Sequence, residues 1–373
     1  MAEKFLLKDH LFNAQSIGQL AAEYAAGLPG FDADRFVTET LDGFPERELL
    51  ARLEWIADCL EPHLAPDFPT MADQLEACMP PPLDPALRDD DFGQFIHAVP
   101  GILAVRHGLE DHCARALDLI YAATQRFSME FYIRPFLNRW PEETLARLAV
   151  WAEDENYHVR RLVSEGTRPR LPWAKAVTLD TAQRVPLLSA LHADPTRFVT
   201  RSVANHLNDI TKTDPELVLG LLKDWAKQGR QDAKELEWMT RHALRTLVKA
   251  GHAGALAHLG YRGDVAVRAS LDLGPSAIPI GAVLPVQCTL SADVDLPVLV
   301  DYRIRFVRPG GKRAEKVFKL KQARITAGKP LTLGKSHRLK GDATTFTLHP
   351  GVHRVFLQVN GVDVAEASFT LTA

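Results

Sequence analysis

A spacing of about forty residues recurs in the middle of this chain and limits the folds open to it. The recurring positions are Asp154, Val159, Arg161, Val163 and Glu165, then Asp194, Val199, Arg201, Val203 and Asn205, then Met239, Arg241, Ala243 and Arg245. Each copy follows another amphipathic segment, at 142–152, 180–192 and 215–228. Two helices within about forty residues is the period of HEAT-type repeats, which stack into solenoids. The repeat therefore predicts a helical solenoid with a long concave surface.

The polar positions of each second helix form rows in which positive charge dominates. The first of these helices is expected to begin near Asp154, and positions three and four apart lie on one face of a helix. The rows are Arg161, Glu165 and Arg168; Arg201, Asn205, Asn208 and Lys212; and Arg241, Arg245 and Lys249. A solvated helix face usually mixes both signs of charge, whereas only one acid interrupts these rows. They therefore favour a surface that binds a polyanion over an ordinary solvated face.

The single acid of the rows, Glu165, stands among four arginines: Arg160, Arg161, Arg168 and Arg170. Nearby positive charge lowers the pKa of a carboxyl group. We therefore expect Glu165 to be ionised. Such a carboxylate either faces a cation or belongs to an ion-pair network, and the pattern leaves both open.

A second acid, Glu130, lies in the aromatic-rich stretch FSMEFYIRPFLNR over 127–139. A carboxylate among aromatic rings is partly desolvated, which is typical of functional carboxylates. The alternative is a surface glutamate between core aromatics. Pro135 in the same stretch is expected to bend or end a helix.

Charge is distributed unevenly along the 373 residues. Residues 1–150 hold 12 Lys+Arg against 25 Asp+Glu, a net charge of −13. Residues 151–262 hold 17 against 13, and residues 263–373 hold 15 against 9, so these parts carry +4 and +6. Phosphate contacts supply most non-specific affinity for nucleic acid. The second and third parts, including the basic run over 312–340, are therefore the expected sites of polyanion binding.

Several functional classes are disfavoured. The N-terminus lacks the pattern of a signal peptide, and no apolar run reaches membrane-spanning length. The four cysteines have no paired spacing, and the 14 histidines form no known ligand motif. We therefore expect a cytoplasmic protein without cofactor, metal or membrane association.

The helical pattern covers most of residues 1–262. After Gly263 it is replaced by an alternation of apolar and polar residues, which is typical of β-strands. Helices are expected over 14–26, 34–41, 46–59, 70–78, 92–100 and 109–126, with a proline-rich connection over 61–91. Strands are expected over 264–273, 283–290, 298–307, 316–325, 345–348, 352–359 and 362–371. Asn360-Gly361 between the last two is a strong hairpin signal. The chain is therefore predicted to be a multidomain α plus all-β protein: an α-solenoid of HEAT-like repeats over 1–262 and an immunoglobulin-like β-sandwich over 263–373.

SEGTRPRLPW at 164–173, NYHVRRLV before it and FSMEFYIRPFL upstream resemble the AlkC-type bacterial DNA alkylation repair glycosylases. These enzymes belong to the AlkC/AlkD superfamily of HEAT-like repeat proteins. The resemblance extends over essentially the whole chain, including the C-terminal immunoglobulin-like domain of some AlkC proteins.

The resemblance implies excision of cationic N-alkylated bases, such as 3-methyladenine and 3-methylcytosine, from duplex DNA without extruding the base. On the motif, Glu165 is the implied catalytic carboxylate, Glu130 a second active-site acid and Trp173 the aromatic beside the lesion. The implied partner is alkylated double-stranded DNA, whose phosphates are gripped by Arg160 and Arg170 together with the basic rows. The protein is expected to be a monomer in the bacterial cytosol, associated with the nucleoid when bound to DNA.

A second interpretation is a HEAT-repeat scaffold without catalytic activity. It binds an acidic protein or a nucleic acid through the same basic rows, and Glu165 then serves as a structural ion-pair partner. Activity on methylated duplex DNA distinguishes the two interpretations.

Overall fold

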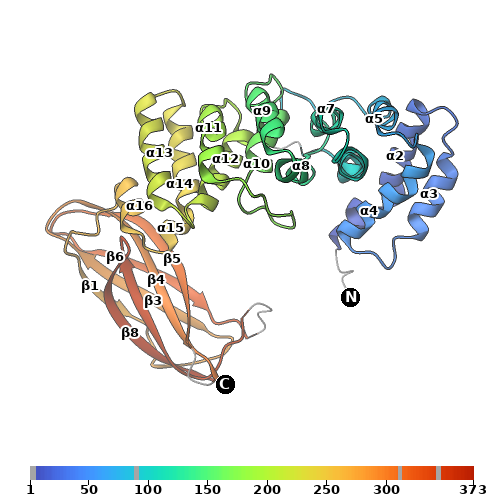
Figure 1. The fold of residues 1–373 in the computed structure, drawn as a ribbon. Helices are drawn as coiled ribbons and strands as arrows, with labels where there is room; N and C mark the ends of the chain where they lie inside the picture. Colours follow the sequence, from blue (N-terminus) through green and yellow to red (C-terminus); the bar gives the residue numbers. More distant parts are fainter. Residues whose placement is uncertain (1–5, 88–91, 310–312, 342–345) are drawn as a thin grey trace. The chain divides into compact units, whose positions relative to one another are not determined.

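A stack of helices is followed by a β-sandwich in the computed structural model (Figure 1). The structure describes residues 6–87, 92–309, 313–341 and 346–373. The chain separates into two compact units, of which the first comprises 1–213 with 223–243 and the second 214–222 with 244–373. The predicted fold class, a helical solenoid followed by an immunoglobulin-like sandwich, is confirmed.

The helices of the first unit follow one another in chain order. They are α1 (Leu7–Leu11), α2 (Ala14–Gly27), α3 (Ala33–Asp42), α4 (Leu49–Leu60), the 3₁₀-helix η1 (Glu61–His63), α5 (Phe68–Ala77), the 3₁₀-helix η2 (Phe95–Ala98), α6 (Val99–Leu103), the π-helix η3 (Ala104–Gly108), α7 (Cys113–Thr124), α8 (Ile133–Arg139), α9 (Pro141–Trp151), α10 (Tyr157–Gly166), α11 (Thr181–Leu191), α12 (Arg197–Ile210), α13 (Pro215–Gln228) and α14 (Ala233–Ala243). α13 begins in the second unit. Within the described ranges, every helix is too short or too polar to cross a lipid bilayer.

The forty-residue repeat corresponds to the helix pairs α9–α10, α11–α12 and α13–α14. The second helices pack on one another, α10 on α12 and α12 on α14. Their apolar repeat positions, such as Val159, Val199 and Met239, are fully buried. Burial of one apolar stripe per helix between neighbours is what stabilises a repeat stack.

The helix boundaries differ from expectation at two places. α10 begins at Tyr157 rather than near Asp154, because Asp154 accepts hydrogen bonds from the Asn156 amide (2.7 Å) and the Tyr121 hydroxyl (2.9 Å). The third repeat is also interrupted, since α14 ends at Ala243 and α15 (Arg245–Lys249) is a separate helix. The expectation that Arg241, Arg245 and Lys249 share one continuous helix face is therefore wrong.

Pro135 begins a helix rather than ending one. It occupies the third position of α8, where the backbone amide has no acceptor within the helix. The expected helix over 109–126 likewise starts only at Cys113, after the π-helix η3.

Ion pairs join successive repeats. The Arg160 guanidinium on α10 donates to both carboxylate oxygens of Asp194, at 2.5 and 3.1 Å, and the two side chains are 12% and 2% exposed. In the next repeat Arg197 makes the equivalent contact with Glu235. Arg160, which the sequence placed among the DNA-binding arginines, therefore fastens one repeat to the next.

The Arg160–Asp194 pair predicts a large stability effect. Arg160→Ala leaves the Asp194 carboxylate buried without its cation, which costs about 3–5 kcal/mol. Urea unfolding of the full chain measures this loss. Arg241→Ala is the matched control, because its pair with Glu237 is exposed and contributes about 0.5 kcal/mol at most. Equal losses in both variants would contradict the structural role of Arg160.

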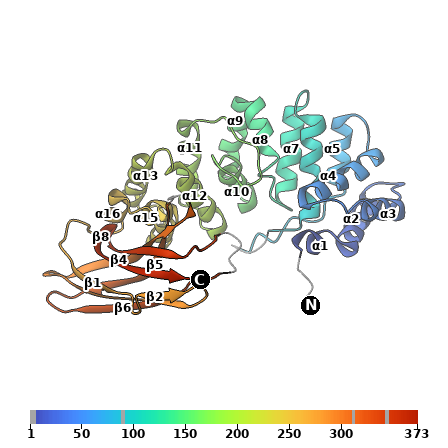
Figure 2. The same cartoon turned by 90° about the horizontal axis from the view of Figure 1, so that it is seen from below.

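The second unit is a β-sandwich of two sheets (Figure 2). Its strands are β1 (Arg268–Asp272), β2 (Ala277–Pro279), β3 (Val283–Ser291), β4 (Leu296–Val307), β5 (Arg313–Ile325), β6 (Leu331–Arg338), β7 (Gly351–Val359) and β8 (Val362–Thr372). One sheet has the order β1-β3-β6 and the other β2-β8-β7-β4-β5. Alternate residues of β4, among them Tyr302, Ile304 and Phe306, fill the core between the sheets.

The predicted strands are confirmed in part. The Asn360-Gly361 turn joins β7 and β8 as an antiparallel hairpin, with positive φ at both residues. The edge strand β6 was not expected, because among its residues only Leu333 is buried and no alternation is visible. Residues 346–348 of the expected strand over 345–348 are not in a strand, while Thr345, like Lys312 of the basic run, lies outside the described residues.

The last helices belong to the compact unit of the sandwich. α16 (Ala253–His258) and the residues after it contact β4, with Leu256, Tyr261 and Leu299 in one buried cluster. The side-chain amide of Asn360 donates to the Arg262 carbonyl at 2.8 Å. The change from helix to strand lies near the predicted boundary at 262/263, but the compact unit begins earlier in the chain.

Candidate active site

Six alternating charges form one connected network, which we name the charge ladder: Glu130, Arg161, Glu165, Arg168, Asp209 and Lys212. Arg161 Nη1 lies 2.7 Å from Glu130 Oε2, and Arg161 Nη2 lies 4.0 Å from Glu165 Oε2. Arg168 bridges Glu165 Oε1 at 2.6 Å and Asp209 Oδ2 at 2.9 Å. Lys212 ends the ladder at 3.0 Å from Asp209 Oδ1.

Glu165 is held by two successive repeats. Its own helix α10 supplies Arg161, and Arg168 follows two residues after the helix ends, so the two arginines lie four positions before and three positions after Glu165. From α12, the Ser202 hydroxyl donates to Glu165 Oε2 at 2.6 Å, and Ser202 Oγ lies 2.9 Å from Ser164 Oγ. The Glu165 side chain is only 6% exposed, so its position is defined closely by these contacts.

These contacts keep Glu165 ionised. Burial alone raises the pKa of this carboxyl group, but the charges of Arg161 and Arg168 and the hydrogen bond from Ser202 outweigh burial and lower the pKa below its usual value. A buried, ionised carboxylate produces a strong local field, because little water screens it. The expectation of an ionised Glu165 therefore agrees with the geometry.

Glu130 is the more accessible acid of the charge ladder, with its side chain 18% exposed. Glu130 Oε2 accepts hydrogen bonds from Arg161 at 2.7 Å and from the Ser128 hydroxyl at 2.5 Å. The Arg161 guanidinium also lies over the Phe198 ring, 4.5 Å from its centroid. Arg161 thus orients both carboxylates and is itself fixed by an aromatic ring of the next repeat.

The loop between α10 and α11 presents Trp173. This side chain is 73% exposed, and its φ of 64° is unfavourable for a non-glycine residue. Arg134, fully buried, donates to the carbonyls of Gly166, Arg168 and Lys175 at 2.9, 2.9 and 2.5 Å and so fixes the loop on α8. A strained, exposed tryptophan on a firmly held loop indicates a functional position.

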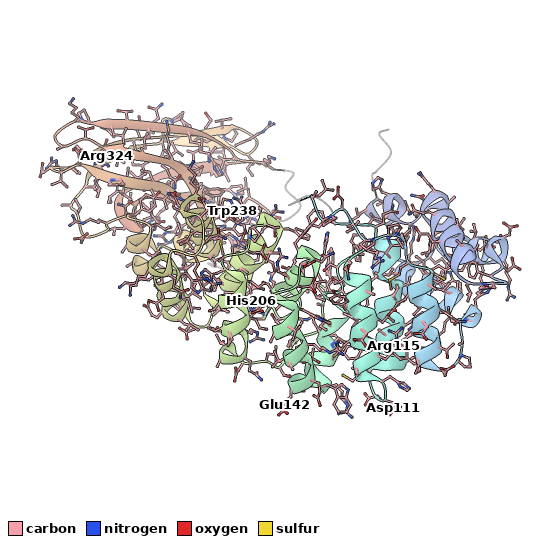
Figure 3. The ribbon with its side chains drawn as sticks, turned by 90° about the horizontal axis from the view of Figure 1, so that it is seen from above. Asp111, Arg115, Glu142, His206, Trp238 and Arg324 are labelled. Atoms are coloured by element: carbon pink, nitrogen blue, oxygen red, sulfur yellow. The ribbon has the colours of Figure 1, made fainter. Side chains whose placement is uncertain are left out.

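His206 lies on α12 within the helical stack and is fully buried (Figure 3). Its Nδ1–H donates to the Ser164 carbonyl at 3.0 Å, and its buried Nε2 has no hydrogen-bond partner within the described residues. Burial, with the charge of nearby Arg184, lowers the pKa of His206 to about 3. The imidazole is therefore neutral in the folded protein at neutral pH.

The neutral His206 predicts how stability depends on pH. A base whose folded-state pKa is depressed favours the unfolded state once the unfolded imidazole takes up a proton, so stability is lost as the pH falls from about 6.5 toward 3. His206→Asn keeps a donor for the Ser164 carbonyl and removes this titration. Its unfolding free energy should therefore fall less steeply than that of the wild type over this range, by up to about 1.4 kcal/mol per pH unit. Urea unfolding at stepped pH measures it, with exposed His10→Asn as the control, and parallel curves for wild type and H206N would contradict the assignment.

The predicted DNA-binding residues have different environments. Asn208 is buried and donates to the Ala243 carbonyl at 2.7 Å, and Lys212 is paired with Asp209. Asn205 is half-buried and contacts His242 at 2.9 Å. Arg201 is half-buried on the same helix, α12, while the exposed members are Arg170, Lys212, Arg241, Arg245 and Lys249. Arg245 and Lys249 belong to the second unit.

Several residues of the site were not found from the sequence. Ser128 and Ser202 donate hydrogen bonds to the carboxylates of the charge ladder and Asp209 is one of its members, but a serine or aspartate in a helical repeat has no distinguishing pattern. Arg134 was passed over for the same reason. Each contacts the ladder or its loop from another repeat, and that relation is visible only in three dimensions.

Comparison with known proteins agrees with this geometry. The family described as "DNA alkylation repair enzyme" matches residues 126–247, and the family described as "Uncharacterised protein YhaZ, C-terminal Ig-like domain" matches residues 267–373. The first match covers all of the charge ladder. The helical stack and its site are therefore of the DNA alkylation repair class.

Two individual proteins resemble nearly the whole chain. YhaZ of Bacillus subtilis strain 168 is 32% identical over 360 residues, which are 94% of this chain and 95% of YhaZ. The structure of Pseudomonas fluorescens alkylpurine DNA glycosylase AlkC, bound to DNA containing an abasic site analogue, superposes with a TM-score of 0.84 at 34% identity, covering 98% of this chain and 99% of AlkC. The chain therefore belongs to the AlkC/YhaZ family of DNA alkylation repair proteins.

Proposed function

We propose that this protein is a DNA glycosylase that hydrolyses the N-glycosidic bond of cationic N-alkylated bases, such as 3-methyladenine and 3-methylcytosine, in duplex DNA. Glu165 is the proposed catalytic carboxylate, Glu130 the second acid and Trp173 the aromatic beside the lesion. The observation that supports this best is the buried, ionised Glu165 of the charge ladder. The relationship to AlkC, whose structure contains abasic-site DNA, supports the substrate class.

The chemistry of the substrate suits a site built from carboxylates. An alkylated cationic base is already a good leaving group, so it needs no general acid. As its bond to the sugar breaks, positive charge develops on the deoxyribose, as in glycoside hydrolysis. A fixed negative charge aimed at that sugar stabilises the transition state without reorganisation. Departure of the base and attack of one water then leave an abasic site and the free base.

The two acids differ in a way that suggests a division of labour. Glu165 is buried and paired on both oxygens, which suits a fixed source of negative potential. Glu130 is more exposed and makes its contacts through Oε2. We assign Glu165 to stabilisation of the sugar cation, and both acids to orientation of the attacking water.

Trp173 supplies a flat face for the cationic nucleotide. Its exposed indole is free of the core, and cation–π contact with an alkylated base contributes about 0.5–2 kcal/mol. A residue that meets the lesion from outside the duplex removes the need to extrude the base into a closed pocket, in contrast to most glycosylases. We therefore propose excision without base flipping.

Glu165→Gln tests the catalytic assignment. The change preserves shape and removes the negative charge, so single-turnover release of methylated bases should fall by roughly 10²–10³, the effect of losing one electrostatic stabiliser. Binding to undamaged duplex should stay constant or tighten, because an acid facing phosphates is removed. N-methyl-nitrosourea-treated DNA is the substrate.

The matched control is Glu237→Gln, which neutralises an exposed acid outside the charge ladder. Melting temperatures of both variants are measured on the same preparations. If E165Q only lowers the melting temperature and its folded fraction releases bases at the normal rate, Glu165 is a structural ion-pair partner. A wild type that releases no methylated base would favour the alternative, a scaffold that binds an acidic partner.

The exposed arginine beside Trp173 tests the mode of DNA binding. If Arg170 contacts a phosphate, Arg170→Ala should weaken binding to any duplex. It should also reduce the slope of log affinity against log salt concentration by about 0.9. Fluorescence anisotropy over a salt series measures both, with exposed Lys227→Ala on α13 as the control. An affinity that does not depend on salt would exclude a basic DNA surface.

A further inference from the structure

Two aromatic side chains stand out as exposed in the part of the chain that the structure describes: Trp173, 73% exposed, and Phe92, 51% exposed. The proposed reaction uses Trp173 and gives no role to Phe92. An aromatic ring left half in water forgoes the stabilisation of burial. The exposure of Phe92 therefore calls for an explanation, and its position relative to the charge ladder indicates one.

Phe92 is one ring away from the charge ladder. Its ring packs edge-on against Phe198 of α12, with centroids 5.0 Å apart and planes at 74°. Phe198 is 4% exposed, and the Arg161 guanidinium lies over its face. Phe92, Phe198 and Arg161 thus form a continuous stack that leads from solvent to Glu130 and Glu165.

The backbone fixes Phe92 from the other side. Gly93 pairs with Phe127, immediately before Ser128 of the site. Its φ is 67°, and a Cβ at this position would lie 1.9 Å from the Arg126 carbonyl oxygen, so only glycine permits the approach. The close approach places the Phe92 ring at the edge of the site.

Residues 80–83 are held to the same turn. The Leu83 amide donates to the Gln125 carbonyl at 2.9 Å, and Arg126 Nε donates to the Pro80 carbonyl at 2.8 Å. An exposed ring on a segment that is anchored in this way is held ready for a ligand.

We propose that Phe92 is a stacking residue for DNA, and that its exposed face contacts a nucleobase next to the damaged nucleotide. The inference rests on the proposed function and adds a residue to it. Every nucleobase has a π-face, and stacking on an aromatic side chain is the usual way in which proteins hold an unstacked base. Phe92 carries no charge, so a phosphate contact is excluded for its ring. Together with Trp173 it gives the site two aromatic contacts from two separate segments.

The experiment uses the full chain and a duplex with a tetrahydrofuran abasic analogue. The fluorescent base 2-aminopurine is placed in turn on each side of the analogue and opposite it. Phe92→Leu keeps an apolar contact with Phe198 but lacks a π-face, and Phe92→Trp restores one. Leu87→Ala, which removes an exposed apolar side chain from the same segment, is the control.

We expect F92L to bind the abasic duplex roughly tenfold more weakly than wild type, with an unchanged salt slope because no phosphate contact is lost. The emission of 2-aminopurine in the complex should change at one of the three positions, and F92W should restore both affinity and emission. Leu87→Ala should behave as wild type.

Two results would overturn the inference. One is wild-type affinity and emission for F92L with only a lowered melting temperature, which would make Phe92 a cover for Phe198. The other is an equal loss of affinity in Leu87→Ala. A wild type that binds the abasic duplex through Phe92 but releases no methylated base would refute the glycosylase proposal and leave the stacking role supported.

Discussion

The rest of the site depends on the ion pairs that the Arg168 guanidinium makes with Glu165 and Asp209. The guanidinium joins Glu165 of one repeat to Asp209 of the next, and all three side chains are nearly buried. Each carboxylate would be strongly destabilised in this position without its cation. The arginine therefore allows two negative charges to stay ionised inside a helical stack. Arg161 and Arg168 flank Glu165, and the ionised Glu165 carboxylate creates a negative potential at the interface between two repeats.

The same interface also explains how the site remains rigid. Hydrogen bonds from Ser202 and His206 on α12, and from Ser128 before α8, reach the ladder or its backbone from two different segments. The loop that bears Trp173 is fixed independently by Arg134, which occupies three of its carbonyl oxygens. Preorganisation of this kind is what electrostatic catalysis requires, because the charges must not relax as the transition state forms.

The sequence predicted those features that depend on local spacing. The repeat, the hairpin at Asn360-Gly361 and the neighbourhood of Glu165, Arg161 and Arg168 all arise from residues a few positions or one fixed period apart. The sequence did not predict which polar side chains contact a neighbouring repeat and which face solvent. Arg160 and Asn208 fit the basic pattern, yet they bind Asp194 and a backbone carbonyl. Contacts such as Phe92 with Phe198 join residues 106 positions apart, and no periodicity encodes them.

The ties between α10 and α12 have a mechanical consequence. Glu165 stands on α10 and accepts a hydrogen bond from Ser202 on α12, so the length of that hydrogen bond depends on the angle between two neighbouring repeats. Solenoids bend by small rotations distributed over their repeats. Any load that opens or closes the stack at this joint therefore changes the environment of one ionised group. Bending of the helical stack and the pKa of Glu165 are therefore coupled in this protein.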